Sequence, residues 1–192
     1  SAYGLVGIVI ASARVSHSVD FAPVKDSRAG DLAAILTNLE ENDFSDLGQL
    51  IGILHNTEDL NLVCALDRVF NVQDYLKTMA AQIFCGDWDG YLYNKNNFYL
   101  YHNTLTGRLE YIPYDVDNSF GIDWFGINWA ERNIYGWQPG GDQVRPLYDR
   151  IINNPVLRDQ FSYYVRQLIE STLDIDSLVA AIEERKEMIY PL

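Results

Sequence analysis

The sequence predicts an α+β protein that is mostly helical and carries one small β-hairpin. Apolar residues recur at helical spacing both before residue 86 and after residue 144. Between these regions, the runs FYLYH and RLEYIPY alternate side chains as β-strands do, and the turn-like NTLTG joins them. The chain has 192 residues without a repeat or low-complexity tract, so we expect a single domain over residues 1–192.

The remaining elements are predicted from apolar periodicity and from helix start signals. Residues 3–12 are rich in Val and Ile and predict a buried strand, followed by a loop at 13–30. Helices are expected from Asp31, around 47–54, around 62–70, from Asn71 to Gly86, at 145–152, from Pro155 and from about Asp176.

The helix that ends at Gly86 has the clearest signals. Asn71 can cap its first turn, with Asp74 completing a variant of the capping box. Its apolar face is expected to consist of Tyr75, Leu76, Met79, Ala80, Ile83 and Phe84. The helix would then deliver Asp87, Trp88 and Asp89 to a loop just beyond its end, and loops held by a rigid element often carry catalytic groups.

Composition excludes several classes of protein. The net charge of −13 argues against a broad nucleic-acid-binding surface, which needs an excess of Lys and Arg. No signal peptide is predicted, and the apolar run at 3–11 is about half as long as a membrane-spanning helix. The chain starts with Ser on an apparent strand and ends directly after an apparent helix, so we expect a fragment of a longer protein.

Acidic residues occur at both ends of the predicted hairpin region: Asp87 and Asp89 before it, Asp115 and Asp117 after it, with Asn96 and Asn97 between. A hairpin folds its ends back together, so these groups can converge. Carboxylates with an amide oxygen, and without a His or Cys cluster, suit a hard cation such as Mg²⁺. An extended chain would also place Asp115, Asp117 and Ser119 on one face.

Other interpretations of this segment are weaker. The run beginning at Asp115 is not an EF-hand, because Phe120 occupies the position that needs Gly and Gly126 the position that needs Glu. The aspartates can instead cap the hairpin. The aromatic residues nearby can form a carbohydrate platform beside paired carboxylates, but no protonated acid is distinguished and the asparagines have no role in that scheme.

The stretches DWDGYLYNKNNFYLY at 87–101 and IPYDVDNSFGIDW at 112–124 resemble the CotH (spore coat protein H) kinases, atypical members of the protein-kinase-like fold. The resemblance is specific over roughly residues 70–125. It implies the mostly helical larger lobe of that fold and an ATP-dependent phosphotransferase acting on Ser or Thr of a protein substrate. It also implies an extracytoplasmic or cell-surface setting.

The resemblance assigns roles to individual residues. Asp89 corresponds to the catalytic-loop aspartate, Asn97 to the metal-binding amide and Asp115 to the main ligand of Mg²⁺ (or Mn²⁺) beneath ATP, with Asp117 adding charge or a second ligand. The gap from Asp89 to Asn97 is longer than in typical kinases. Asp87 therefore remains an alternative to Asp89, and Asn96 to Asn97. By strand alternation, Asn97 shares one face with Tyr99 and Tyr101, and Asn96 shares the other with Phe98 and Leu100.

One departure from kinases concerns the ATP-holding smaller lobe. No Gly-rich loop or strand Lys paired with a helix Glu precedes Asp87, and Lys25 is the only Lys before Lys77. We therefore expect the smaller lobe to be largely absent and this fragment to be poorly active. The rival interpretation is a non-catalytic secreted or surface binding module with a structural divalent-cation site.

Overall fold

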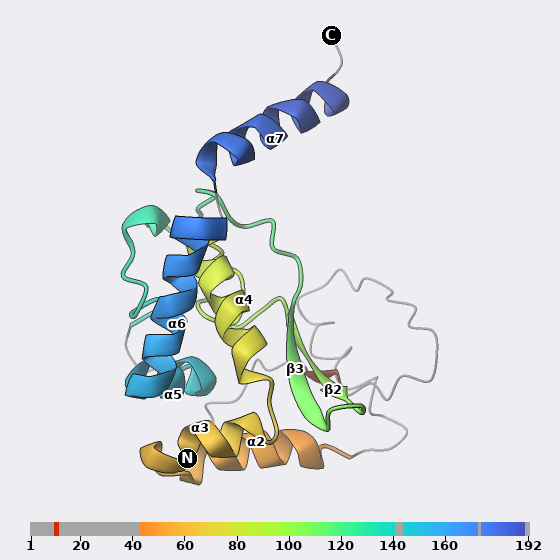
Figure 1. The fold of residues 1–192 in the computed structure, drawn as a ribbon, viewed down its shortest axis with the longest axis vertical. Helices are drawn as coiled ribbons and strands as arrows, with labels where there is room; N and C mark the ends of the chain where they lie inside the picture. The colour runs from red at the N-terminus through yellow and green to blue at the C-terminus, as the bar shows by residue number, and fades with distance from the viewer. Residues whose placement is uncertain (1–9, 12–42, 141–143, 173, 191–192) are drawn as a thin grey trace.

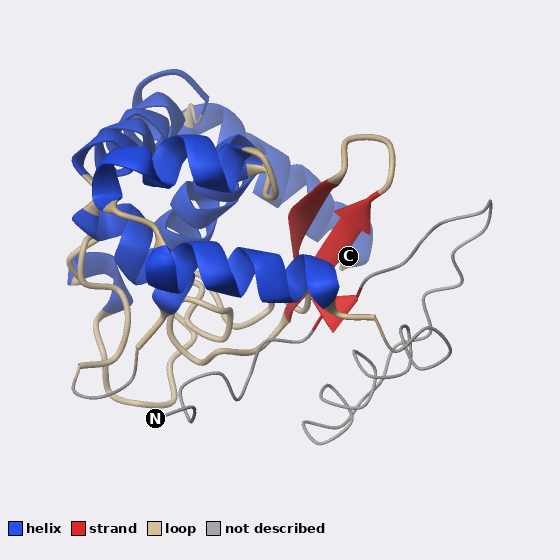
Figure 2. Ribbon diagram, turned by 90° about the horizontal axis from the view of Figure 1, so that it is seen from below, coloured by secondary structure: helices blue, strands red, loops and turns tan. Residues whose placement is uncertain are grey.

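The computed structural model describes residues 10–11, 43–140, 144–172 and 174–190. Most of its helices lie together and its short strands lie beside them, so the predicted α+β class is confirmed (Figure 2). The elements in chain order are β1 (Ile10–Ala11), α2 (Ser45–Asn56), α3 (Asp59–Asp67), α4 (Val72–Cys85), β2 (Phe98–Asn103), β3 (Arg108–Pro113), η1 (Trp129–Glu131), α5 (Pro146–Asn153), α6 (Pro155–Gln167), η2 (Leu168–Thr172) and α7 (Ile175–Ile189).

The sheet has the order β1-β2-β3, with β1 (Ile10–Ala11) parallel to β2 and β2 antiparallel to β3. The register pairs Phe98 with Pro113 and Asn103 with Arg108, which confirms the predicted hairpin. The free edge of β3 is partly paired, because the Leu109 N–H donates to the Val69 carbonyl at 2.8 Å. The sheet is thereby joined directly to the segment that leads into α4.

Helix α4 forms where the sequence predicts it. The Asn71 side chain accepts a hydrogen bond from the Asp74 N–H at 3.3 Å, and Gly86 ends the helix in the left-handed conformation with φ 71°. The expected apolar face is buried except for Phe84, which is 40% exposed. This helix therefore forms the centre of the core and fixes where the next loop begins.

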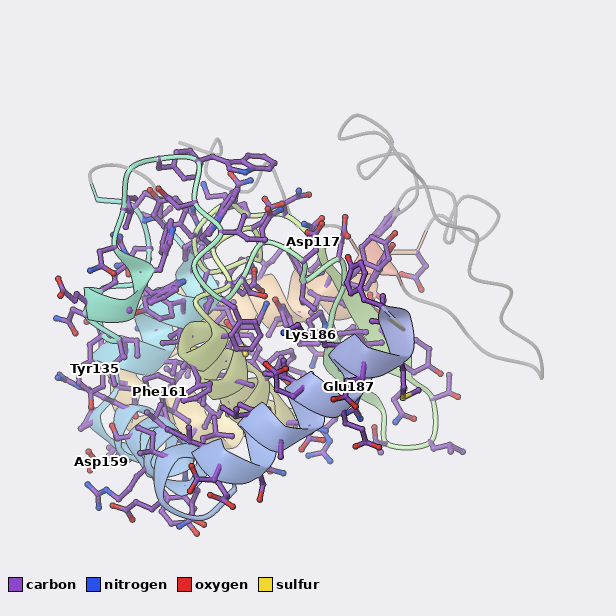
Figure 3. All side chains as sticks on the ribbon, turned by 90° about the horizontal axis from the view of Figure 1, so that it is seen from above. Asp117, Tyr135, Asp159, Phe161, Lys186 and Glu187 are labelled. Atoms are coloured by element: carbon purple, nitrogen blue, oxygen red, sulfur yellow. The ribbon has the colours of Figure 1, made fainter. Side chains whose placement is uncertain are left out.

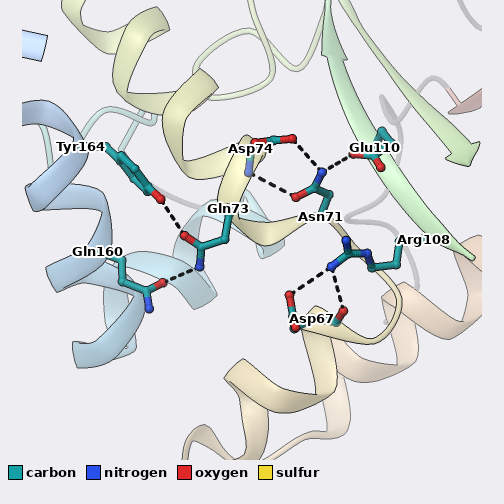
Figure 4. A network of polar contacts seen from close by, with 8 residues as sticks. All are labelled: Asp67, Asn71, Gln73, Asp74, Arg108, Glu110, Gln160 and Tyr164. Carbon is teal, nitrogen blue, oxygen red and sulfur yellow. Dashed lines mark hydrogen bonds and ion pairs between the residues drawn. The ribbon is translucent and has the colours of Figure 1, made fainter. Parts of the chain in front are cut away.

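Polar contacts hold α4 between the hairpin on one side and α6 on the other (Figure 4). The Asn71 amide donates to Glu110 of β3 at 2.6 Å. Gln73 donates to Gln160 of α6 at 3.1 Å, and the Tyr164 hydroxyl donates to Gln73 at 2.7 Å. These contacts couple the first turn of α4 to both neighbouring elements.

The C-terminal helices are less uniformly packed. Asn154 caps α6 by accepting hydrogen bonds from the N–H groups of Val156 and Leu157 at 3.1 and 3.2 Å. Beyond η2, α7 projects away from the other helices, and none of its described residues is buried (Figure 1). Within the described residues, no helix is both long and apolar enough to cross a membrane. The predicted helix from Asp31, most of the strand at 3–12, and Lys25 lie outside the described residues.

Candidate active site

The loop after α4 gives its two aspartates different environments. Asp87 is only 3% exposed, accepts a hydrogen bond from Gln82 Nε2 at 2.6 Å and another from the Asp89 N–H at 3.1 Å. Burial raises the pKa of the Asp87 carboxyl above its usual value. A side chain at Gly90 would disturb this contact, because its Cβ would lie 2.6 Å from Gln82 Nε2 and 3.1 Å from Asp87 Oδ2. The buried Asp87 carboxylate thus stabilises the loop through hydrogen bonds, whereas the Asp89 side chain is half-buried and partly open to solvent.

Three side-chain amides donate to the Asp89 carboxylate. The Asn97 and Asn118 amides reach Oδ2 at 3.0 and 3.1 Å, and the Asn94 amide reaches Oδ1 at 2.5 Å. A carboxylate accepts up to about four hydrogen bonds, so these neutral donors fix its orientation and leave its negative charge in place. Neither Asn94 nor Asn118 was assigned a role from the sequence. Asn118 lies inside the segment that begins at Asp115, which is the signal that could have identified it.

Asn97 connects the two acidic segments. Its Nδ2 donates to Asp89 and also to the Asp115 carbonyl oxygen at 3.4 Å, and its own carbonyl accepts from the Tyr114 N–H at 2.9 Å. This geometry selects Asn97 over Asn96 as the amide beside Asp89. The predicted alternation of Asn96 and Asn97 with the strand does not hold, because β2 begins at Phe98 and Asn97 has a φ of 52°.

Left-handed backbone is concentrated at this site. Among the described residues, the non-glycine residues with positive φ are Lys95 (58°), Asn97 (52°), Asp115 (51°) and Phe120 (53°). Such residues cost free energy unless the surrounding structure holds them, and they cluster at functional sites. Asn and Asp tolerate this conformation better than most residues. Two of the four are residues that the sequence singled out as ligands.

The loop that follows β3 differs from the predicted extended chain. Asp115 is left-handed, and a turn brings the Ser119 N–H to the Asp117 carbonyl at 3.0 Å. Ser119 is therefore buried, while Asp115 and Asp117 are exposed, so the three side chains do not share one face. In the view from above, Asp117 lies far across the projected molecule from Asp159 of α6 (Figure 3).

The atoms of this site that could bind a metal ion are oxygens. Because Asn97 Nδ2 donates to the Asp89 carboxylate, its Oδ1 is the atom left to bind a cation beside that carboxylate, whereas Asp115 meets Asn97 through its backbone carbonyl and its own carboxylate is exposed. Hard oxygen donors of this kind fit Mg²⁺ or Mn²⁺ better than a softer metal. In the part of the chain that the structure describes, no three His, Cys, Asp or Glu side chains form a metal-binding group by themselves. A cation here would therefore need the asparagine, and further oxygen ligands from outside the protein.

A buried arginine supports the loop between Asp89 and Asn97. Arg145 is 1% exposed, and its Nε donates to the Tyr91 carbonyl at 3.1 Å while Nη2 donates to the Tyr93 carbonyl. Its backbone N–H donates to Asp149 Oδ2 at 2.8 Å. Burial lowers the pKa of the Arg145 guanidinium from its usual value. The start of α5 is thereby attached to the loop, although Arg145 carried no signal in the sequence.

A family model described as CotH kinase protein matches residues 12–192 of this sequence. The chain belongs to the CotH family. It is 26% identical over 160 residues to the inner spore coat protein H of Bacillus subtilis strain 168, covering 81% of this chain and 40% of that protein. In Rhizopus delemar it is 23% identical to spore coat protein homolog 1, over 84% of this chain and 27% of that protein. It is 20% identical to invasin CotH7 of the same fungus, over 85% of this chain and 28% of that protein.

This CotH chain thus spans well under half the length of these curated relatives. Its mostly helical body with a peripheral hairpin is consistent with part of a kinase-like fold. In this chain α4 packs against α6 and β3, and β3 leads directly into the loop that carries Asp115 and Asp117.

Three of the four tryptophans of this CotH chain are core residues. Trp88, Trp129 and Trp137 are at most 4% exposed, and the Trp88 indole N–H donates to the Ile122 carbonyl at 2.8 Å. Trp124 is the exception, since it is 72% exposed while its ring contacts Trp88 edge-on at 5.1 Å between centroids. These tryptophans therefore do not form a sugar-stacking platform, because three of the four rings are buried and Trp124 alone among them is exposed beside the site.

Proposed function

We propose that this chain carries the catalytic residues of an ATP- and divalent-metal-dependent phosphotransferase that modifies Ser or Thr of a protein substrate. The observation that supports it most is the Asn97 side chain, which donates to both the Asp89 carboxylate and the Asp115 carbonyl. The order of a catalytic Asp, an Asn and a metal-binding Asp is the order used by protein kinases. Membership of the CotH kinase family supports the same reaction class.

Each residue has a role in this proposal. Asp89 would orient the attacking hydroxyl and accept its proton, because its carboxylate is half-buried and fixed by three amide donors. Asn97 and Asp115, with Asp117 beside them, would hold Mg²⁺ or Mn²⁺. The metal would neutralise charge on the ATP phosphates. Asp87 would support the loop and take no part in the reaction.

The setting of the whole protein is also a proposal. Its curated relatives are named as spore coat proteins and as an invasin, so we propose an extracytoplasmic or cell-surface location. The chain covers only part of those relatives, and the nucleotide-holding elements of a kinase were not found in its sequence. We therefore expect this chain to bind metal and nucleotide weakly and to transfer phosphate slowly by itself.

The test is a thermal-shift titration with Mg²⁺, Mn²⁺ and Ca²⁺, each with and without ATP. Asp115→Asn is the informative variant, because Asn tolerates the left-handed backbone of this residue and removes only the charge. Asp159→Asn on α6 is the matched control, since Asp159 is exposed and distant from Asp117 in Figure 3. A ligand at about 100 times its Kd stabilises a protein by about 2.7 kcal/mol.

Stabilisation by ATP that requires Mg²⁺ or Mn²⁺, and that is lost in Asp115→Asn but kept in Asp159→Asn, is the expected result. Stabilisation by Ca²⁺ alone with no effect of ATP would contradict the proposal and would favour a structural cation site in a binding module. Equal loss in both variants would also contradict it, because the effect would then reflect net charge.

A further inference from the structure

Four large apolar side chains are exposed within six residues of the loop that follows the acidic segment. Phe120, Ile122, Trp124 and Phe125 are 74%, 48%, 72% and 52% exposed, and we call them the aromatic patch. Contiguous exposed apolar surface on a folded protein usually marks a binding site. By comparison, the other most exposed large apolar residues outside α7, Leu60 and Leu105, are isolated in sequence from one another and from the patch.

The backbone that carries the aromatic patch is held by hydrogen bonds despite the exposure of its side chains. The Asp123 carboxylate, between Ile122 and Trp124, accepts hydrogen bonds from the N–H groups of residues 125, 126 and 127 at 3.1, 2.6 and 3.0 Å, and from Trp129 Nε1 at 2.9 Å. Partial burial acts to raise the pKa of Asp123, but these donors together lower it. A surface that is already ordered loses little conformational entropy on binding a partner.

The patch adjoins the candidate site through Trp88, the residue between Asp87 and Asp89. The Trp88 ring contacts Trp124 and Phe125 edge-on, with centroid distances of 5.1 and 5.0 Å. At the other end of the patch, the Phe120 N–H donates to the Cys85 carbonyl at the end of α4 at 2.6 Å. Phe120 also borders an open, largely apolar groove of about 630 Å³ that reaches Phe84 and Ile169.

The chemistry of the patch selects the kind of partner. The only polar side chain between Ile122 and Phe125 is Asp123, and its oxygens are already used by four donors, so a sugar would find few partners for its hydroxyl groups. An anionic membrane surface is disfavoured by the net charge of −13 and by the exposed Asp115 and Asp117. An apolar side chain of a peptide meets neither obstacle.

We infer that the aromatic patch binds an apolar or aromatic side chain of a protein substrate close to the residue that Asp89 acts on. Identifying the bound peptide as a substrate rests on the proposed phosphotransferase function, whereas the binding itself does not. The surface would select substrates by a large apolar residue near the acceptor hydroxyl, with the groove beside Phe120 receiving the continuing chain.

The fluorescence of Trp124 reports whether the aromatic patch is covered. The protein has four tryptophans, and the other three are at most 4% exposed, so acrylamide quenching of tryptophan fluorescence measures the exposure of Trp124. The probes are fluorescein-labelled peptides that contain one serine among alanines, with Phe replacing one Ala at each position in turn. Binding is measured by anisotropy without nucleotide, and shielding of Trp124 is measured by quenching with unlabelled peptides.

We expect at least one Phe peptide to bind about tenfold or more tightly than the all-Ala peptide and to shield Trp124 from acrylamide. Trp124→Ala and Phe120→Gly should remove this preference, measured by anisotropy, and Leu105→Ala on the hairpin turn should keep it. Leu105 is 95% exposed and lies in the turn between β2 and β3, so it controls for loss of any exposed apolar side chain.

Equal binding of Phe and Ala peptides would overturn the inference. So would shielding of Trp124 by chitohexaose or by phosphatidylserine vesicles but not by peptides, because a sugar or a membrane would then be the occupant. Shielding that depends on protein concentration alone would identify a second copy of the chain and would also overturn it. If Phe peptides bind but Mg²⁺ with ATP never stabilises the protein, the phosphotransferase proposal fails and the peptide surface stands. If Mg²⁺ with ATP stabilises the protein but Phe peptides bind no more tightly than the all-Ala peptide, only the peptide-binding inference is rejected.

Discussion

The side-chain amide of Asn118 donates to the carboxylate of Asp89 at 3.1 Å, joining residues 29 positions apart in the sequence. Asn118 belongs to the loop after β3 and is 8% exposed, whereas Asp89 belongs to the loop after α4. This hydrogen bond therefore connects the two acidic segments directly, in parallel with the bridge made by Asn97. Because the donor is buried, water cannot easily replace it when it is removed.

Asn118→Ala should lower the free energy of unfolding by about 2 kcal/mol, since a hydrogen bond to a charged group is worth about 1.5–3 kcal/mol. Asn94→Ala removes another donor to the same carboxylate, but Asn94 is exposed, so its loss should cost under about 1 kcal/mol. Urea denaturation at neutral pH measures both. Equal losses in the two variants would show that burial of Asn118 does not strengthen its contact.

Phe120 gives a prediction about backbone strain. It is a bulky residue with a φ of 53°, and its ring is 74% exposed, so the strain is not offset by burial of the side chain. Phe120→Gly should therefore be at least as stable as the natural protein, and more stable than Phe120→Ala by about 1 kcal/mol. The comparison of Gly with Ala isolates the backbone term, because both remove the ring.

The measurement is urea denaturation of the three proteins, analysed with a common slope. A Phe120→Ala variant that equals or exceeds Phe120→Gly in stability would refute the strain argument. The expected outcome, a stability that survives loss of the ring, would indicate that Phe120 is retained for binding and not for folding.

Replacing Arg145 should cause a large loss in the free energy of unfolding. Arg145→Met would leave the buried carbonyls of Tyr91 and Tyr93 without their donors, so we expect a loss of about 3 kcal/mol or more. Arg145→Lys should be intermediate, because a single ammonium cannot reproduce the planar set of guanidinium donors. Arg158→Met is the control, since the exposed Arg158 guanidinium lies 4.1 Å from the centroid of the Tyr135 ring and should contribute under about 1 kcal/mol.

Urea denaturation and near-ultraviolet circular dichroism together distinguish a loss of global stability from local loosening of residues 91–93. If Arg145→Met were as stable as Arg158→Met, the arginine would not be what attaches α5 to the loop. Any response to Mg²⁺ with ATP should weaken along with the attachment, because this segment lies between Asp89 and Asn97.

Much of the fold follows from the sequence because its signals are local. The Asn71 cap, the apolar face of α4 and the stop at Gly86 each depend on residues within one helix, and the hairpin depends on alternation and a short turn. Phe84 was the exception on α4, and its exposure arises because it borders an open groove instead of a packed neighbour.

The site was predicted less completely because its geometry is not local. The sequence offered Asp89, Asn97 and Asp115 as candidates, but Asn118 and Arg145 act across 29 and more than 50 positions. The strand alternation assumed for Asn97 and for Asp115, Asp117 and Ser119 was wrong because left-handed residues interrupt the extended chain. Such conformations are stabilised by long-range contacts, which sequence patterns do not contain.

The buried carboxyl of Asp87 makes stability depend on pH in a defined direction. Its pKa is raised above the ordinary value of 3.8 mainly by burial, so the folded protein binds this proton more tightly than the unfolded chain. The contribution to stability is therefore fully present below pH 3.8 and is lost as pH rises through the raised pKa. One such group changes the slope by at most about 1.4 kcal/mol per pH unit.

Asp87→Asn should flatten the part of the profile that lies above pH 3.8, measured by urea denaturation at successive pH values. Its absolute stability is less informative, because the Asn side chain has a single acceptor oxygen, so either the Asp89 N–H or Gln82 Nε2 would lose its acceptor. Burial also raises the pKa of Asp149, but that group is the same in both proteins and cancels in the comparison. Asp117→Asn, at an exposed position, should keep the natural slope. An unchanged slope in Asp87→Asn would mean that Asp87 stays ionised at little cost, and it would then remain a rival to Asp89.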